Sequence, residues 1–268
     1  MQRCIRWSVT TLLLACVSAV SALEWEGPRV QGGLLIGQVE PGSAVEAMGE
    51  SIPVTADGRF LLGLGREAPA EIQVIVFDPE GLSARYDLQI EQREYAIQRI
   101  DGLPESQVTP DEQTLQRIRA ENARVAAARA ERIDEAFFDT GWIWPVTGPI
   151  TGVYGSQRIL NGQPRQPHYG VDIAAPTGTP VQAPADGIVT LVEPDLFFSG
   201  GTLIVDHGQG LSSSFLHLSS IEVEAGQRVR RGDTIAKVGA TGRVTGAHLD
   251  WRMNWFGQRI DPALLLKP

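Results

Sequence analysis

Short alternating hydrophobic and polar runs occupy the chain from Arg29 to about Ile100. The runs GGLLIGQV, RFLLGLG, EIQVIVFD and ARYDLQIEQ are separated by turn sequences such as Ala56-Asp57-Gly58. Alternation with a period of two between turn residues is typical of antiparallel strands. The pattern predicts a small β-sandwich over residues 23–100, in an immunoglobulin-like arrangement. This region contains neither histidine nor cysteine, so we expect a spacer or a module that docks a partner.

A helical pattern follows. Thr109-Pro110-Asp111-Glu112 supplies an N-cap, a proline at the first helical position and a glutamate at the third, which is a strong helix start. We expect the helix to run to about Ala136, within a helical linker at 101–136. Asn122 and Arg129 interrupt its thin apolar stripe, which favours a packed connector within the chain over a coiled-coil dimer. The stripe contains Leu115, Ile118, Val125 and Ile133.

Strand-like runs return in the last part of the chain. GIVTLV, TLIVDH, SSFLHL, TIAKVG and HLDWRM are rich in β-branched residues and are separated by glycine-marked turns. They predict an antiparallel β domain over residues 137–268. The whole chain is therefore predicted to be mainly β, with a single linking helix.

The first 22 residues have the pattern of a secretory signal peptide. Arg3 and Arg6 precede an apolar run that ends at the small residues Val20-Ser21-Ala22. The run is shorter than the roughly 20 residues of a membrane span, so we expect export to the periplasm or cell envelope without a transmembrane anchor. A lipoprotein-like box at Cys16 is the alternative. Cys4 and Cys16 are the only cysteines, so the mature protein would contain no disulfide.

The charge distribution excludes one class of partner. The formal net charge is −9, and the excess of acidic residues lies between Leu23 and Ala136. Such a surface argues against nucleic acid as a partner, and it shows no polybasic patch for anionic lipid.

All four histidines lie in the predicted C-terminal domain: His168, His207, His217 and His248. His168 and Asp172 form an HxxxD motif that can reach one ion only if the chain bends, which Gly170 permits. On a strand, His248 and Asp250 would point to the same side. We therefore expect Zn²⁺ to bind His168, Asp172 and Asp250, with a fourth position open for water, as in a catalytic zinc site.

These motifs resemble the lysostaphin-like, LytM-type zinc metallopeptidases, over roughly Trp142 to Pro268. The resemblance implies that His168 and Asp172 bind zinc and that His217 and His248 are catalytic. The chain departs from the family pattern at Asp250, where a second zinc-binding histidine is expected. A carboxylate is an ordinary zinc ligand, but two carboxylates place two negative charges on the ion instead of one, which should weaken its Lewis acidity. His207 is expected to serve a hairpin turn.

The resemblance implies an exported zinc metalloendopeptidase that cleaves the peptide cross-links of bacterial peptidoglycan, with stem peptides as substrate. Because of Asp250, the alternative is an inactive member that binds peptidoglycan or activates other cell-wall hydrolases or division proteins. Tyr154, Arg158 and Trp251 are candidate substrate contacts, although aromatic residues are more often part of a core.

Overall fold

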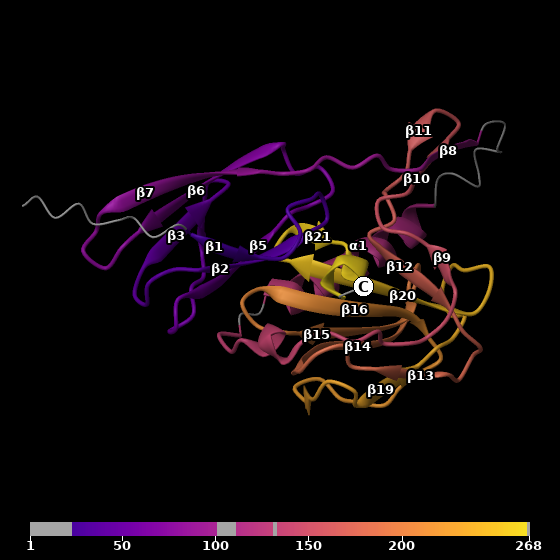
Figure 1. The fold of residues 1–268 in the computed structure, drawn as a ribbon. Helices are drawn as coiled ribbons and strands as arrows, with labels where there is room; N and C mark the ends of the chain where they lie inside the picture. Colours follow the sequence, from indigo (N-terminus) through magenta and orange to yellow (C-terminus); the bar gives the residue numbers. More distant parts are fainter. Residues whose placement is uncertain (1–22, 101–110, 131–132, 267–268) are drawn as a thin grey trace, which may run out of the picture.

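The computed structural model describes residues 23–100, 111–130 and 133–266. The predicted signal peptide and its Cys16 alternative lie outside these residues. The described chain is mainly β with one α-helix (Figure 1), which confirms the predicted fold class. None of the described helices is both long and apolar enough to span a membrane.

The N-terminal region forms two antiparallel sheets, in the orders β1-β2-β5 and β4-β3-β6-β7. Their inward positions alternate with exposed ones, as in β3, where Val45 and Ala47 are buried between exposed neighbours. The sequence runs named above become β2, β5, β6 and β7. The strands are β1 (Glu24–Glu26), β2 (Leu34–Gln38), β3 (Ala44–Ala47), β4 (Glu50–Ile52), β5 (Arg59–Gly63), β6 (Glu71–Phe77) and β7 (Ser83–Gln89).

Helix α1 (Glu112–Ala130) follows β8 (Ile97–Ile100). Its N-cap is Asp111, whose Oδ1 accepts a hydrogen bond from the Thr114 N–H at 2.8 Å. The predicted cap residues Thr109 and Pro110 lie outside the described residues. The helix packs within the chain, because Arg124 forms an ion pair with Glu193 at 2.6 Å.

The C-terminal region is built on an eight-stranded antiparallel sheet in the order β18-β14-β15-β16-β20-β12-β9, with β21 paired to β20. Its strands are β9 (Ile150–Gly152), β12 (Gly170–Ala174), β14 (Gly187–Leu196), β15 (Gly200–Asp206), β16 (Leu211–Leu218), β18 (Arg228–Val229), β20 (His248–Trp255) and β21 (Gln258–Ile260). A smaller sheet contains β13 (Pro180–Gln182), β19 (Thr234–Lys237) and β17 (Ser220–Ile221). The 3₁₀ helices are η2 (Phe137–Thr140) and η3 (Pro262–Leu265).

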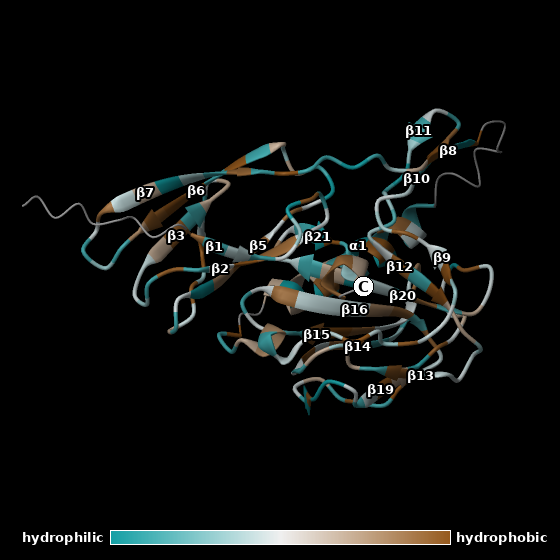
Figure 2. Cartoon of the chain, in the orientation of Figure 1, coloured by the Kyte–Doolittle hydropathy of each residue, from teal (hydrophilic) through white to brown (hydrophobic). Residues whose placement is uncertain are grey.

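The N-terminal and C-terminal sheets share one hydrophobic core. Phe60 and Leu62 belong to the same buried cluster as Trp251 and Trp255, and hydrophobic residues gather on strands of both regions (Figure 2). An ion pair of 2.8 Å between Arg93 and Asp261 also joins the two regions. The N-terminal module is therefore packed onto the C-terminal region and is not a loosely tethered spacer.

Two segments that precede the C-terminal sheet lie beside the face that carries the histidines. Strand β8 pairs in parallel with β10 (Gln157–Leu160), which in turn pairs with β11 (Gln163–Pro164) (Figure 1). Helix α1 packs Val125 and Ala128 against Leu191 of β14 and Ile204 of β15. Register pairing continues this row from Ile204 to Ser214 of β16 and then to Arg252 of β20, so α1 covers the face on which Arg252 lies.

Candidate metal and catalytic site

Sheet register places the two carboxylates of the site opposite each other. Asp172 on β12 pairs directly with Asp250 on β20, and residues paired in this way lie on the same face of a sheet. Glycines make room for them: a Cβ on Gly152 would clash with the Asp172 carboxylate, and one on Gly170 with Asp250. The third group, His168, lies just before β12, where its N–H donates to the Ser156 carbonyl at 2.7 Å. The chain therefore bends between His168 and Asp172, as the spacing requires.

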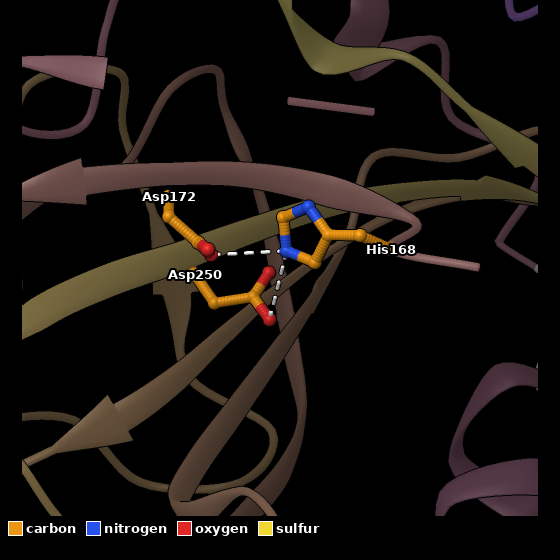
Figure 3. A group of neighbouring side chains, drawn as sticks. All are labelled: His168, Asp172 and Asp250. Atoms are coloured by element: carbon orange, nitrogen blue, oxygen red, sulfur yellow. Dashed lines mark ion pairs between the residues drawn. The ribbon is translucent and has the colours of Figure 1, made fainter. Parts of the chain in front are cut away.

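The three side chains converge at one point (Figure 3). His168 Nε2 lies 2.9 Å from Asp172 Oδ1 and 3.5 Å from Asp250 Oδ2. Ligands bonded to zinc at about 2.0–2.1 Å in a tetrahedron lie roughly 3.3 Å from one another, and these two separations bracket that value. The ligand atoms of all three side chains lie within 4.8 Å of one another, close enough to share one cation.

The chemistry of the donor set also fits a cation. His168 Nε2 and Asp172 Oδ1 are buried and have no hydrogen-bond partner of good geometry among the described residues. Burial lowers the pKa of His168, but the carboxylates of Asp172 and Asp250 outweigh burial and raise this pKa to about 10. A positive charge is thus strongly favoured where these atoms meet, and either a proton on His168 or a metal ion in its place supplies it.

Arg252 changes the electrostatics expected from the sequence. Its Nε lies 3.0 Å from both oxygens of Asp250, and its Nη2 lies 2.6 Å from Oδ2. Burial acts to raise the pKa of Asp250, but Arg252 and His168 outweigh it and hold that pKa well below its usual range. The guanidinium cancels the charge of Asp250, so the donor set carries the same net charge as two histidines and one aspartate. The expectation of one extra negative charge at the site is therefore wrong, because Arg252 neutralises Asp250.

The signal for Arg252 was present in the sequence. His248, Asp250 and Arg252 are alternate residues of one strand, so the rule that placed His248 beside Asp250 also places Arg252 there. A carboxylate has about four lone-pair sites, so Asp250 retains acceptor capacity for a metal while it is held by Arg252.

A bulge brings His217 onto the same face. Gly201 and Leu203 of β15 pair with Leu218 and Phe215 of β16, so one extra residue lies on β16 at this point. His217 takes up the extra residue with φ of 66°, a left-handed conformation that is uncommon outside glycine. Its ring centroid lies 4.9 Å from that of His248, and His248 Nε2 lies 3.8 Å from Asp172 Oδ1. The two histidines predicted as catalytic therefore adjoin the donor set.

Two of the three predicted substrate contacts are misplaced. Trp251 is 0% exposed and Tyr154 is 2% exposed, so neither side chain has surface to offer a substrate. Trp251 points to the opposite side of β20 from Asp250, into the core, and the Tyr154 hydroxyl donates to the Arg259 carbonyl at 2.7 Å. Arg158 is exposed and lines a cleft with His168 and Asp172.

His207 lies away from the cluster. It is fully buried, where its Nδ1 lies 2.6 Å from the Asp186 carbonyl and its Nε2 lies 2.6 Å from the Ser213 hydroxyl. Because the carbonyl can only accept, Nδ1 carries the proton and Nε2 accepts from Ser213. His207 thus holds together the segment around the β15–β16 connection and does not contribute to the site.

Comparison with known proteins gives the family. The model for peptidase family M23 matches residues 166–262. A crystal structure from Pseudomonas aeruginosa, described as that of an M23 peptidase, is 32% identical, covers 88% of this chain and 94% of that one, and has a TM-score of 0.69. The chain belongs to peptidase family M23. The resemblance inferred from HxxxD and the later histidine motifs is thereby confirmed at the level of the family.

Other M23-type relatives share only a segment with this chain. The peptidoglycan DD-endopeptidase ShyA of Vibrio cholerae is 42% identical over 95 residues, which are 35% of this chain and 22% of that protein. The DD-carboxypeptidase/endopeptidase Mpg of Neisseria meningitidis is 39% identical over 101 residues, which are 38% of this chain and 23% of that protein. The matched part thus spans less than a quarter of the length of these relatives.

Proposed function

We propose that this M23 protein is an exported, zinc-dependent endopeptidase that cleaves peptide cross-links of bacterial peptidoglycan. The observation that carries the proposal is the convergence of His168, Asp172 and Asp250 at zinc-ligand spacing, with His217 and His248 beside them. The names of ShyA and Mpg, which act on peptidoglycan or as endopeptidases, support the substrate class. The leader-like sequence of residues 1–22 supports export.

His168, Asp172 and Asp250 would hold the zinc, which supplies a Lewis acid that polarises the scissile carbonyl. His217 donates its Nδ1–H to the Thr241 carbonyl at 2.9 Å, and His248 donates its own to the Gly246 carbonyl at 2.9 Å. Each ring therefore leaves Nε2 free of these carbonyl contacts, either to accept a proton or to carry one. Burial lowers the pKa of His217, so it is neutral at pH 7 and able to accept a proton from the attacking water.

His248 is the second proton-handling group. Its position beside Asp172 suits it to stabilise charge on the substrate oxygen or to pass a proton to the leaving amine.

The alternative is a non-catalytic member that binds peptidoglycan or activates another cell-wall hydrolase. One observation favours it: both oxygens of Asp250 are already engaged by Arg252, which competes with metal binding.

Two measurements on the protein purified without chelators separate the alternatives. The endopeptidase should contain about one zinc per chain and release cross-linked peptides from isolated sacculi, and a chelator should stop the release. Zinc-free protein that takes up none on titration and leaves sacculi intact would contradict the proposal and favour the activator.

A further inference from the structure

A pocket lined by arginine adjoins the cluster of histidines and carboxylates. It has a volume of about 530 Å³ and is bounded by α1 on one side and by the sheet that carries His217 on the other. The arginines that line it are Arg129, Arg165, Arg243, Arg252 and Arg259. Three of these, Arg165, Arg243 and Arg252, also line the cleft that contains His168 and Asp172, so the pocket and the cleft form one continuous groove.

Three of the arginines that line this pocket have no carboxylate partner among the described residues. Its one acidic lining residue, Glu121, accepts hydrogen bonds from Arg117 at 2.6 Å and from the Phe197 N–H at 2.8 Å. Among the described residues, Arg129, Arg243 and Arg259 form no ion pair with a carboxylate; Arg259 instead contacts Asn254. The charge of Arg252, by contrast, is cancelled by Asp250.

Arg129 is the most informative of these residues. Its Nη2 donates to Ser214 Oγ at 2.9 Å, while its buried Nε has no partner among the described residues. Burial, together with the charges of Arg259 and Arg252, lowers the pKa of Arg129 to about 9. A buried cation without a counter-charge lowers the stability of the fold, and such costs are typical of functional positions.

Arg129 spans the pocket from α1 to β16. Ser214 pairs in register with Arg252, so Arg129 reaches down from α1 to the row of side chains next to that of Asp250. An anion in the pocket would therefore lie among several guanidinium groups and close to His217, which lines the same space. Guanidinium groups bind planar carboxylates through paired hydrogen bonds.

We infer that this pocket is a subsite for a carboxylate of the peptide substrate, held by Arg129 together with Arg243 and Arg259. The inference rests on the proposed peptidase function for the identity of the ligand. The subsite would give helix α1 a direct part in substrate choice, although α1 lies outside the strands that carry the candidate ligands and histidines. A peptide with a carboxylate near the scissile bond would be preferred over one in which that carboxylate is an amide.

The test compares two forms of one probe. An uncross-linked stem peptide released from sacculi has no cross-link to be cut, and its carboxylates can be left intact or converted to amides. Binding of both forms to the full mature chain is measured by isothermal titration. We expect the carboxylate form to bind on the order of 10- to 100-fold more tightly, the range for hydrogen bonds to a charged group.

Three variants locate the effect. Arg129→Gln should reduce this preference by about tenfold or more, and Arg129→Lys should keep part of it because the charge remains. Arg119→Gln is the matched control, because Arg119 lies on the same helix but is exposed and paired with the exposed Glu112. Arg129→Gln should be at least as stable in urea as the wild type, since it removes an unpaired buried charge.

Several outcomes would overturn the subsite. These are equal binding of the two peptides by the wild type, an unchanged preference in Arg129→Gln, or an equal loss in Arg119→Gln. Digestion of sacculi is scored separately with the wild type. Preferential carboxylate binding without digestion would contradict the peptidase function and leave the subsite intact. Digestion without this binding preference would support the peptidase function and overturn the subsite.

Discussion

Two partly buried arginines that meet at the same sheet face, Arg252 of β20 and Arg129 of α1, have opposite electrostatic surroundings. Arg252 lies 2.6 Å from Asp250, so its charge is cancelled within the chain. Arg129 contacts only a hydroxyl among the described residues. At one end of the groove the chain itself supplies the counter-charge, whereas at the other end the proposed subsite would obtain it from a carboxylate of the substrate.

The largest effect on activity is expected from the loss of a candidate zinc ligand, at the end of the groove where Arg252 pairs with Asp250. His168→Ala removes one of three candidate ligands, and a three-ligand site that loses one seldom retains its ion. We expect zinc content, measured by mass spectrometry, to fall to background and sacculus digestion to stop. Arg158→Gln, in the same cleft, should retain the metal. Full zinc content in His168→Ala would exclude His168 as a ligand.

The histidines between the two ends should affect rate without affecting metal. His217→Ala and His248→Ala should each keep zinc and lose on the order of 10² to 10⁴ in the rate of cross-link cleavage, the usual contribution of acid-base groups. Rates are measured on isolated sacculi beside zinc analysis of the same samples. Cleavage at the wild-type rate by either variant would remove that histidine from the mechanism.

Breaking the pairing of Arg252 should turn a balanced charge into an unbalanced one. Arg252→Gln leaves the buried Asp250 with His168 as its remaining charged partner, and Asp250→His leaves the partly exposed Arg252 without its carboxylate. Each should therefore lose about 3 kcal/mol of unfolding free energy, the lower end of the range for breaking a buried pair. The double variant, Asp250→His with Arg252→Gln, removes both charges and should be less destabilised than the sum of the single changes. Urea unfolding of chelator-treated protein measures this coupling. Additive losses would show that the two side chains do not act as a pair.

The smallest effect is expected at His207, a buried histidine outside the groove. Burial lowers the pKa of His207 from 6.5 to about 4, so the unfolded chain binds a proton between these values while the folded chain does not. Stability is therefore fully present above pH 6.5 and is lost as the pH falls toward 4, by roughly 3 kcal/mol at most. Urea midpoints between pH 4.5 and 7.5 measure the slope. His207→Gln should flatten it, and an unchanged slope would assign the acid sensitivity to other groups.

Local rules were sufficient for most of the fold. The runs from GIVTLV to HLDWRM became β14, β15, β16, β19 and β20 because period-two alternation and glycine turns decide strand and connection within a few residues. The same alternation placed His248 beside Asp250. Thr109 and Asp111 are both good caps, and local sequence alone does not choose between them; the described residues show a capping hydrogen bond to Asp111, while Thr109 lies outside them.

Features that depend on distant parts of the chain were not predictable. The left-handed conformation of His217 arises from a register shift against β15, which no local pattern encodes. Tyr154 and Trp251 were assigned to the substrate because aromatic residues suit both grooves and cores, and only the three-dimensional packing decides between them. In the sequence, Arg129 interrupts the apolar stripe of α1. Nothing in that sequence indicates that the guanidinium of Arg129 reaches Ser214 of β16.

Helix α1 and strand β8 form part of the groove, yet both precede residues 166–262, the segment by which the family is recognised. The sequence of this part of the groove can therefore change in evolution independently of the strands that carry the candidate ligands and histidines. Under the proposed subsite, a lineage would change which peptides are accepted by altering α1 while every residue of the matched segment stays the same. Two proteins identical across that segment need not share a substrate, and the helix that precedes it is the place to look for the difference.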